Sequence, residues 1–371
     1  MKFSCEKSLI QAAVTTASRA ASVRSAVPSL EGLLIEAHSD VRISGYDLKT
    51  GIRTTLSADV VEEGAVVLNA RLFGDIIRKM PDDIFVVDVD ERFTAKIKCG
   101  MSEFEIIGFN EVDYPEFPSV DYQNSIYIQE KTLKAMIAQT NFAVSDNEAR
   151  PIHTGSLFEV EDGVLTVVSV DGYRLALRRE PLERTEIEKC SFVVPGTALS
   201  EVEKIASETD DLVKITQGSK HIMFTIGTTT LVSRKLEGEF LNYKNSVPTT
   251  GKYQILADRR LIVSSVERVS LIINDRLKSP VRCVFTDGLL KVYTSTALGK
   301  ASDECPISGD GDGLEIGFNN KYILDALKAA PSDNIVLLIS TGISPCVIVP
   351  AGGETNFIYM ILPVRLKANE S

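Results

Sequence analysis

Histidine, a frequent metal ligand and general base, occurs in this chain only at positions 38, 153 and 221. No two histidines have the HxxxH or HxH spacing that presents two imidazoles to one metal ion. The segment GDGDGLEIG (309–317) begins like a calcium-binding loop. Leu314 at the fifth position and the lack of a glutamate at the twelfth break that pattern. We therefore predict a turn there and no metal site.

Asp171 is the one carboxylate that could be imagined as catalytic, in the segment SVDGYRLAL (169–177). No acid or base near it in sequence could act as its partner, and an Asp-Gly hairpin turn explains the segment better. We expect Tyr173 and Arg174 to be exposed where this turn enters a strand. The glycine motifs that cradle phosphates and the GxSxG nucleophile elbow are absent from the sequence. The sequence thus predicts no enzyme and no cofactor.

Length and composition predict a protein of two or three domains. The chain has 371 residues, of which 44% are hydrophobic and 25% charged, and one core rarely serves so long a chain. Its six cysteines form no CxxC pair, which favours reduced thiols. We see no secretory signal and no membrane span, and we expect a cytoplasmic protein. The net charge of −11 argues against a nucleic-acid-binding surface that covers the whole molecule.

The chain contains three copies of one pattern. Amphipathic helices are predicted at 6–22, 130–144 and 258–270, so that they recur about every 125 residues. A second helix follows each, and the three are predicted at 70–80, 197–208 and 319–330. Leu72, Phe73 and Ile76 follow the same apolar spacing as Tyr322, Ile323 and Ala326. Three homologous α+β domains are therefore expected, with bounds 1–121, 126–248 and 251–371.

Strand patterns fill the rest of each repeat. Residues 83–99 and 212–226 alternate apolar and polar residues, which predicts half-buried strands. Residues 334–349 are nearly continuously apolar, which predicts a more buried strand. Each repeat closes on an aromatic-apolar segment with proline, the last being NFIYMILPV (356–364). Since free tails are usually polar, we expect this end of the chain to be a strand tied into a sheet.

Charge is unevenly distributed between helices and strands. The six helix spans together carry a net positive charge, although the chain is acidic. One interpretation is that the helix faces are simply solvated. The other is that they face a polyanion while acidic sheets face solvent. Charge alone does not decide between these two interpretations.

Taken together, the three repeats, the segment VDGYRLA in the second and the terminus LPVRL resemble the bacterial DNA sliding clamp family, the beta subunit of DNA polymerase III. The resemblance covers essentially the whole chain. It implies two crescent-shaped chains that close head to tail into a ring, with helices lining a central hole. Such a ring holds duplex DNA topologically and tethers the replicative polymerase, without a chemical step. It also implies other partners, namely the clamp loader and replication and repair proteins that carry short linear motifs.

The resemblance assigns site residues by matching motif. A groove for partner peptides would be lined by Ile152, His153, Gly172, Tyr173, Arg174, Leu175, Leu241, Val247, Asn319, Tyr322, Met360, Leu362, Pro363, Val364 and Arg365. In that groove Arg174 and Arg365 would cap polar ends of the peptide. Residues facing DNA would be Arg24, Arg71, Arg78, Lys79 and, more weakly, Asn147. The joint between two chains would use Phe104, Ile106, Leu271 and Ile272, with Lys300, Asp303 and Glu304 near them.

Two features depart from the family pattern. The chain continues past Leu366 with KANES, and His153 stands where an aliphatic residue is usual. Two alternatives to a clamp are a hydrolase that uses scattered carboxylates and a repeat scaffold that binds proteins without encircling DNA. The first would need clustered acids or a nucleophile, which the sequence lacks. The second differs from a clamp in that its chains do not close into a ring, so a test of ring closure distinguishes the two.

Overall fold

The computed structural model describes residues 1–120, 124–274, 279–352 and 356–366. Its contacts divide the chain into two compact units. The first unit comprises residues 1–133, 183–187 and 200–235, and the second comprises residues 134–182, 188–199 and 236–371. The central repeat contributes to both units, so the three domain bounds given above stay a prediction. The KANES tail lies outside the described residues.

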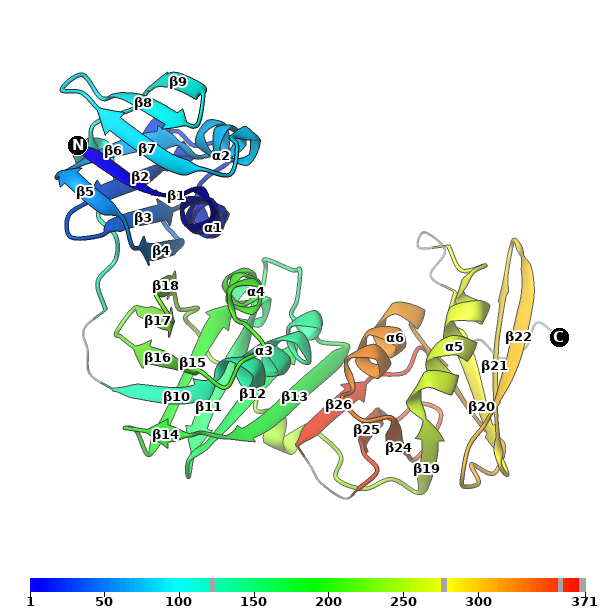
Figure 1. Cartoon of the computed structure of the whole chain (residues 1–371). Coiled ribbons are helices and arrows are strands. Elements are labelled where there is room, and N and C mark those ends of the chain that lie inside the picture. The colour runs from blue at the N-terminus through cyan, green and yellow to red at the C-terminus, as the bar shows by residue number, and fades with distance from the viewer. Residues whose placement is uncertain (121–123, 275–278, 353–355, 367–371) are drawn as a thin grey trace. The chain divides into compact units, whose positions relative to one another are not determined.

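The six predicted helices are all present, in the predicted order (Figure 1). They are α1 (Lys7–Ala17), α2 (Ala70–Lys79), α3 (Glu130–Ala138), α4 (Gly196–Ile205), α5 (Arg259–Ser270) and α6 (Asn320–Ala329). α1 and α3 end earlier than predicted, because short 3-10 turns follow them, η1 (Ser18–Ala20) and η4 (Asn141–Ala143). Thr140 contributes to the end of α3, since its hydroxyl donates to the Met136 carbonyl at 2.7 Å and so competes with the helical bonding pattern.

Apolar stripes and capping residues explain why these segments are helical. Phe73, Ile76 and Ile77 are buried on α2, and Ile323 and Leu327 are buried on α6. These residues recur three and four positions apart, so they share one face of a helix. The side chain of the residue before each of these helices, an asparagine in both cases, accepts amides of the first turn, which are otherwise unpaired.

The first unit contains two antiparallel sheets. The five-stranded sheet has the order β5 (Asp59–Glu62), β1 (Lys2–Glu6), β7 (Ile84–Val89), β8 (Thr94–Cys99) and β9 (Ser102–Ile107). The nine-stranded sheet has the order β14 (Arg184–Thr185), β10 (Ser125–Gln129), β16 (Leu212–Gln217), β17 (His221–Ile226), β18 (Thr229–Arg234), β4 (Thr50–Leu56), β3 (Val41–Tyr46), β2 (Gly32–Ala37) and β6 (Gly64–Asn69). α1 packs on α2 and on strands of both sheets.

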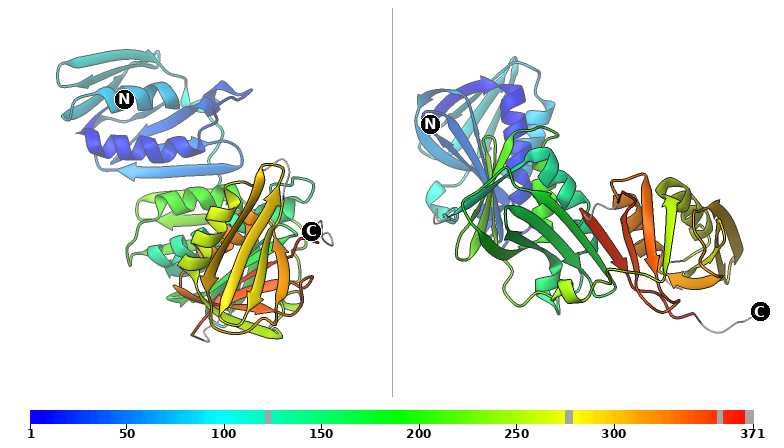
Figure 2. Two further views of the ribbon diagram at one scale, coloured as in Figure 1. Left: turned by 90° about the vertical axis from the view of Figure 1, so that its right-hand side faces the viewer. Right: turned by 90° about the horizontal axis from the view of Figure 1, so that it is seen from below.

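The second unit repeats this construction. Its eight-stranded sheet has the order β15 (Lys189–Pro195), β11 (Gly155–Glu161), β12 (Val164–Val170), β13 (Arg174–Pro181), β26 (Phe357–Ile361), β25 (Cys346–Pro350), β24 (Asn334–Ile339) and β19 (Tyr253–Asp258). Its four-stranded sheet has the order β22 (Gly299–Pro306), β21 (Leu289–Thr296), β20 (Val281–Thr286) and β23 (Leu314–Phe318). α5 packs on α6 and on strands of both sheets, and Figure 2 shows α5 along one face of β20–β22.

Two sheets are formed jointly by neighbouring repeats. β4 of the first repeat pairs with β18 of the second, and β13 of the second pairs with β26 of the third. Each pairing continues a sheet across a repeat boundary by backbone hydrogen bonds. The strand expected at the end of the chain is thus confirmed as β26. β24 is less buried than its apolar sequence predicts, because Val336 and Leu338 lie on a half-exposed face.

Several sheet edges are covered by the chain itself. Isolated bridges pair Phe109 with Val67 on β6, Leu236 with Val193 on β15, and Val364 with Gly317 on β23. β9 and β22 are each the last strand of their sheet, and no described segment bridges their outer edges. Unpaired edges of this kind are sites for pairing with another chain.

Other expectations concern chemistry and membranes. All six cysteines are free thiols, and residues 309–313 form the predicted turn before β23. Within the described residues, no helix is long and apolar enough to cross a membrane. In the same part of the chain, His, Cys, Asp and Glu nowhere gather in a group of three or more that could hold a metal ion.

Asp258, the residue that caps the N-terminus of α5, allows a test of its capping role. Asp258 accepts the amides of Arg260 at 2.7 Å and Leu261 at 3.3 Å. Replacing a capping side chain of this kind by alanine costs about 1 kcal/mol. We expect Asp258→Ala to lower the free energy of unfolding by that amount in a urea titration. Glu6→Ala is the matched control, because Glu6 precedes α1 but makes no capping bond. Equal losses in both variants would contradict this assignment.

Candidate functional site

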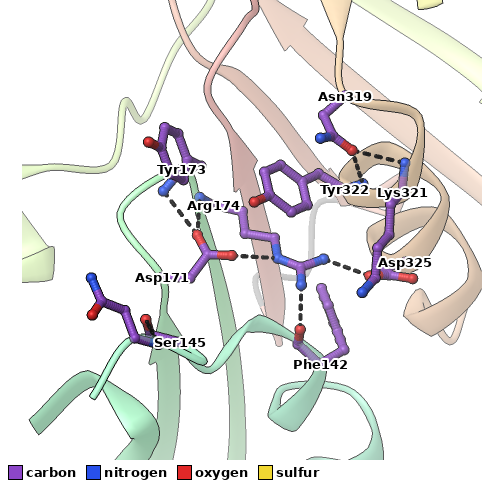
Figure 3. A network of polar contacts seen from close by, with 10 residues as sticks. Phe142, Ser145, Asp171, Tyr173, Arg174, Asn319, Lys321, Tyr322 and Asp325 are labelled. Carbon is purple, nitrogen blue, oxygen red and sulfur yellow. Dashed lines mark hydrogen bonds and ion pairs between the residues drawn. The ribbon is translucent and has the colours of Figure 1, made fainter. Parts of the chain in front are cut away.

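Asp171–Arg174 form a tight turn in the second unit (Figure 3). It joins β12 to β13, as predicted. The Asp171 carboxylate accepts the amides of Tyr173 at 2.8 Å and Arg174 at 3.0 Å. Gly172 has φ +92°, a conformation that glycine adopts without strain. The Asp171 carboxylate therefore shapes the turn, and this structural role explains its presence without a catalytic one.

Arg174 is buried, which contradicts the expectation that it is exposed. Only 7% of its side chain is accessible. Its Nε donates to Asp171 at 2.9 Å, one terminal nitrogen donates to Asp325 on α6 at 2.6 Å, and the other donates to the Phe142 carbonyl at 2.6 Å. Its three nitrogens are therefore committed to three segments of the fold. Arg174 positions these segments and is not presented to solvent.

Two tyrosines from different repeats lie beside Arg174. Tyr173 stacks on Tyr322 with ring centroids 6.1 Å apart and planes at 25°. The Arg174 guanidinium lies 4.5 Å from the centroid of the Tyr322 ring, a favourable cation–π arrangement. Tyr173 is 61% exposed. The predicted site residue Asn319 caps α6 by accepting the Lys321 and Tyr322 amides. It thereby fixes the start of the helix that carries Tyr322.

The C-terminal segment is bound on both sides. The Leu362 amide donates to the Tyr173 carbonyl, and the Val364 amide donates to the Gly317 carbonyl, each at 2.8 Å. A Cβ atom at Gly317 would lie 2.5 Å from the Leu366 side chain and 3.0 Å from the Val364 carbonyl oxygen, so a larger residue there would crowd the C-terminal segment. Leu362, Pro363 and Val364 are half-buried and Arg365 is exposed. This segment therefore forms a fixed surface beside the Asp171–Arg174 turn.

Four of the predicted apolar site residues belong to one cluster, which we call the seam cluster. It consists of Leu157, Val168, Val170, Leu175, Leu177, Val193, Tyr243, Val347 and Met360, with Ile152, Leu236, Phe240, Val247, Leu338, Val349 and Ile358 packed against it. The predicted residues Ile152, Leu175, Val247 and Met360 are members. Sequence reasoning missed Val170, Leu177 and Val347. The signal was present, because alternate strand residues share a face and Leu177 follows Leu175 by two positions.

Two further predicted residues adjoin Phe240, which packs against this cluster. Leu241 is 44% exposed. His153 is half-buried, and its ring meets Phe240 edge-on with centroids 5.6 Å apart. Burial, and then the nearby Arg150 charge, lower the pKa of His153. A neutral imidazole is thereby favoured at pH 7, so His153 acts there as a largely apolar aromatic residue.

Residues predicted to face DNA are exposed, and two of them share a cleft. Arg71 and Arg78 line a cleft of about 490 Å³ between α1 and α2, which Val23 also lines. Arg24 is the exposed residue that follows Val23. Lys79 is exposed in the last turn of α2. Asn147 belongs to the other unit and shapes its own loop, since its side chain accepts the Ala149 amide at 3.0 Å.

Many helix cations are already paired with carboxylates. The pairs are Lys7–Asp82, Arg19–Glu201, Arg78–Asp75, Lys131–Asp210, Lys204–Glu201, Arg259–Asp333, Arg268–Asp303 and Lys328–Glu267. Within the described residues, Arg24, Arg71, Lys79 and Lys321 make no ion pair. The helix faces therefore present less free positive charge than their residue count suggests. Exposed pairs are worth at most about 1 kcal/mol, so an incoming phosphate can displace the carboxylate.

The predicted joint residues occupy open ends of the two units. Phe104 is 42% exposed on edge strand β9, while Ile106 is half-buried against the first core. Sequence reasoning missed Ile107, which is 82% exposed on the same strand. Leu271 follows α5 and is 84% exposed, and Ile272 beside it is half-buried.

Comparisons with known proteins cover nearly the entire chain. Residues 1–118, 127–242 and 244–365 match, in turn, the N-terminal, central and C-terminal domains described as DNA polymerase III beta subunit. The chain is 31% identical to the beta sliding clamp of Halalkalibacterium halodurans, across 98% of this chain and 100% of that one. It is also 31% identical to the beta sliding clamp of Staphylococcus aureus, across 98% and 99% of the two chains.

Solved structures agree with these relatives. The DNA polymerase sliding clamp from Bacillus subtilis superposes with a TM-score of 0.95 at 28% identity, covering 99% of this chain and 100% of that one. A putative DNA polymerase III beta subunit from Eubacterium rectale gives a TM-score of 0.93 at 32% identity, with the same coverage.

Replacing Arg174 tests its positioning role. Arg174→Ala leaves the largely buried Asp171 carboxylate, 11% exposed, without its partner, and removal of one partner from a buried pair costs about 3 kcal/mol or more. We expect native-state hydrogen exchange of the β13 amides to report a loss of that size. Arg365→Ala removes an exposed arginine of the C-terminal segment and should change stability by less than about 0.5 kcal/mol. Equal protection of β13 in the two variants would contradict the assigned role.

Proposed function

The chain belongs to the DNA polymerase III beta subunit family, and we propose that two copies of it close head to tail into a ring that slides along duplex DNA. The observation that carries this proposal is the extent of the match. All three repeats, and nearly the full length of the relatives named beta sliding clamp, are present in this chain. The open edges of β9 and β22 supply surfaces on which one copy could join the next. The joint would use the predicted residues Phe104, Ile106, Leu271 and Ile272.

Contact with DNA would be weak and independent of sequence. A closed ring cannot dissociate sideways, so it needs only the modest, salt-dependent attraction that cations give to phosphates. Helix cations that are mostly paired with carboxylates suit this requirement, because strong binding would slow sliding. The unpaired Arg24, Arg71 and Lys79, together with Arg78 and Asn147, are the proposed contacts. No chemical step and no cofactor enters this function, which we place in the bacterial cytoplasm.

The seam cluster and the C-terminal segment form the proposed surface for partners. Exposed Tyr173, whose carbonyl accepts the Leu362 amide, lies beside half-buried Leu362. Pro363 and Val364 follow in the same segment, and exposed Leu241 follows Phe240, which packs against the seam cluster. Such a surface suits a short peptide whose leucine and phenylalanine side chains fill apolar sites. The partners would be the replicative polymerase, the clamp loader, and other replication and repair proteins. Tethering the polymerase to a ring makes its re-association with DNA intramolecular, at high effective concentration.

Loading on circular DNA tests the ring. The protein would be loaded with a matching clamp loader and ATP onto nicked plasmid, which is then cut once with a restriction enzyme. We expect the protein to stay on circles and to leave linear DNA by sliding off its ends, measured by gel filtration.

The other outcomes have distinct meanings. Equal retention on both forms would show ordinary affinity for DNA and contradict topological binding. No association at all would favour a repeat scaffold that binds proteins without encircling DNA. The observation that favours this alternative is the ion pairing of the helix cations, because it leaves little free positive charge for DNA.

A fluorescent peptide with leucine and phenylalanine at its centre tests the partner surface. We expect Tyr173→Ala to weaken its binding about tenfold, since truncating a central aromatic contact commonly costs more than 1 kcal/mol, as measured by anisotropy. Leu48→Ala is the matched control, because Leu48 is 54% exposed in the corresponding turn of the first repeat. Equal loss in both variants would place the peptide elsewhere.

A further inference from the structure

The two joints between repeats within this chain are built alike. In β4–β18, Ile52 lies opposite Leu231, and in β13–β26, Ala176 lies opposite Tyr359. Beyond each ladder one more bond closes the end. Arg234 N donates to Lys49 O at 3.1 Å, and Leu362 N donates to Tyr173 O at 2.8 Å.

The turns at these joints also match. In the first, the Asp47 side chain accepts the amides two and three residues on. In the second, Asp171 does the same. One geometry therefore occurs twice, with one register.

The open edge strands β9 and β22 contain residues that correspond to those of the two joints. Following the sheet pairings from Phe3 leads through Val87 and Ile97 to Phe104. The corresponding paths from Ile126 and Ile255 lead to Leu231 and Tyr359. Phe104 on β9 is thus the counterpart of the two residues that lie opposite Ile52 and Ala176.

β22 is matched in the same way. The strand that precedes the second helix of each repeat receives an isolated bridge at Val67, Val193 or Gly317. Crossing three successive strand pairs from Val67 leads to Arg53. The same three steps lead from Val193 to Leu177 and from Gly317 to Ser302. Ala301 is therefore the counterpart of Ile52 and Ala176. The turn before β22 has a similar bond, because the Thr296 hydroxyl accepts the amide of Leu298, two residues on, at 3.1 Å. Asp47 and Asp171 accept the amide two residues on in the same way.

From this correspondence, and resting on the ring of the proposed function, we propose a specific register for the joint between two copies. Ala301 of one copy lies opposite Phe104 of the other, which places Lys300 opposite Glu105. The Ile107 amide then donates to the Leu298 carbonyl. The joint is selective for a second copy of this chain because of the charges that this register brings together.

The free state of the charged residues supports this pairing. Glu105 and Lys300 are exposed, and neither makes an ion pair within the described residues. Glu103, two residues from Glu105 on the same strand face, pairs with Lys98 at 3.2 Å. Directly opposite residues of an antiparallel pair share one face of the sheet. Lys300 and Glu105 would thus satisfy each other on the exposed face.

Apolar contacts at the closed joint indicate what covers the open one. Phe142 packs edge-on against Tyr359 at 5.6 Å, and Tyr173 stacks on Tyr322. Leu271 follows buried Val269 by two residues, as Phe142 follows buried Thr140. Leu271 would therefore cover Phe104 of the second copy.

The second contact concerns the turn and α2. Leu298 is the counterpart of Tyr173. Leu72 is the counterpart of Tyr322, because each is the third residue after a capping asparagine. Leu298 would thus meet Leu72 of the second copy. Leu271, Leu298, Leu72 and Phe104 are 84%, 72%, 47% and 42% exposed in one copy, and the register gives each of them a partner.

Charge exchange tests this register. Lys300→Glu and Glu105→Lys each place like charges opposite one another at both joints of a ring. We expect each variant alone to dimerise about tenfold to a hundredfold more weakly, measured by sedimentation velocity over a dilution series. Mixing the two variants should restore near-wild-type affinity. In the mixed ring one joint has the original charge pair and the other has the exchanged pair.

Matched controls and contrary outcomes separate the register from the ring itself. Lys220→Glu and Glu183→Lys make the same charge changes at exposed positions outside both edge strands and should leave dimerisation unchanged. If Leu271→Ala weakens the dimer but neither charge reversal does, or if mixing restores nothing, the ring stands and this register is wrong. A wild-type protein that stays monomeric and is not retained on circular DNA would overturn the proposed function as well.

Discussion

The pairing of backbone groups at strand edges is the constraint on which the rest of the structure depends. Each repeat ends its sheets in strands whose outer N–H and C=O groups need partners. Within the chain, β4 finds β18 and β13 finds β26, so each repeat completes its neighbour. Other edges are closed by short return segments, such as the bridge from Val364 to Gly317. Four terminal strands have no bridging segment within the described residues. Of these, β5 and β14 have only four and two residues, whereas β9 and β22 have six and eight and are long enough to pair with another chain.

Arg174 shows a second way in which the repeats are held in register. Its charge is buried, and this is tolerated because each of its nitrogens has an oxygen partner and two carboxylates offset its charge. The guanidinium is flanked by Phe142 and Tyr322, which come from different repeats. Backbone pairing sets the spacing of β13 and β26, and this side chain fixes the helix α6 relative to them. The neighbouring apolar surface thereby has a defined shape before any partner arrives.

Sequence reasoning was strongest where periodicity is strong. The helices, the repeat and the closing strand were predictable, because apolar residues such as Phe73 and Ile323 recur with helical spacing. The burial of Arg174 was not predictable, since Asp325, its partner on α6, is 151 residues away in sequence. Ion pairing of the helix cations was missed for the same reason, because a charge count does not include partners such as Asp333 or Asp303 on other elements. Among the predicted site residues, Leu175 and Met360 were found through motifs, whereas Val347 has no motif and joins the seam cluster only through tertiary packing.

The attachment of the C-terminal segment has a practical consequence for anyone who labels this protein. Leu362 and Val364 are bonded on opposite sides, and Leu366 lies against Gly317 beside the seam cluster. An affinity tag or fluorescent protein fused after Ser371 would therefore be joined only five residues beyond Leu366, which ends the described segment on which partners are proposed to bind. The N-terminus offers no simple alternative, because the Met1 ammonium donates to the Val89 carbonyl at 3.1 Å within the first sheet. Exposed turns such as that around Lys220, between β16 and β17, are better positions for a reporter group.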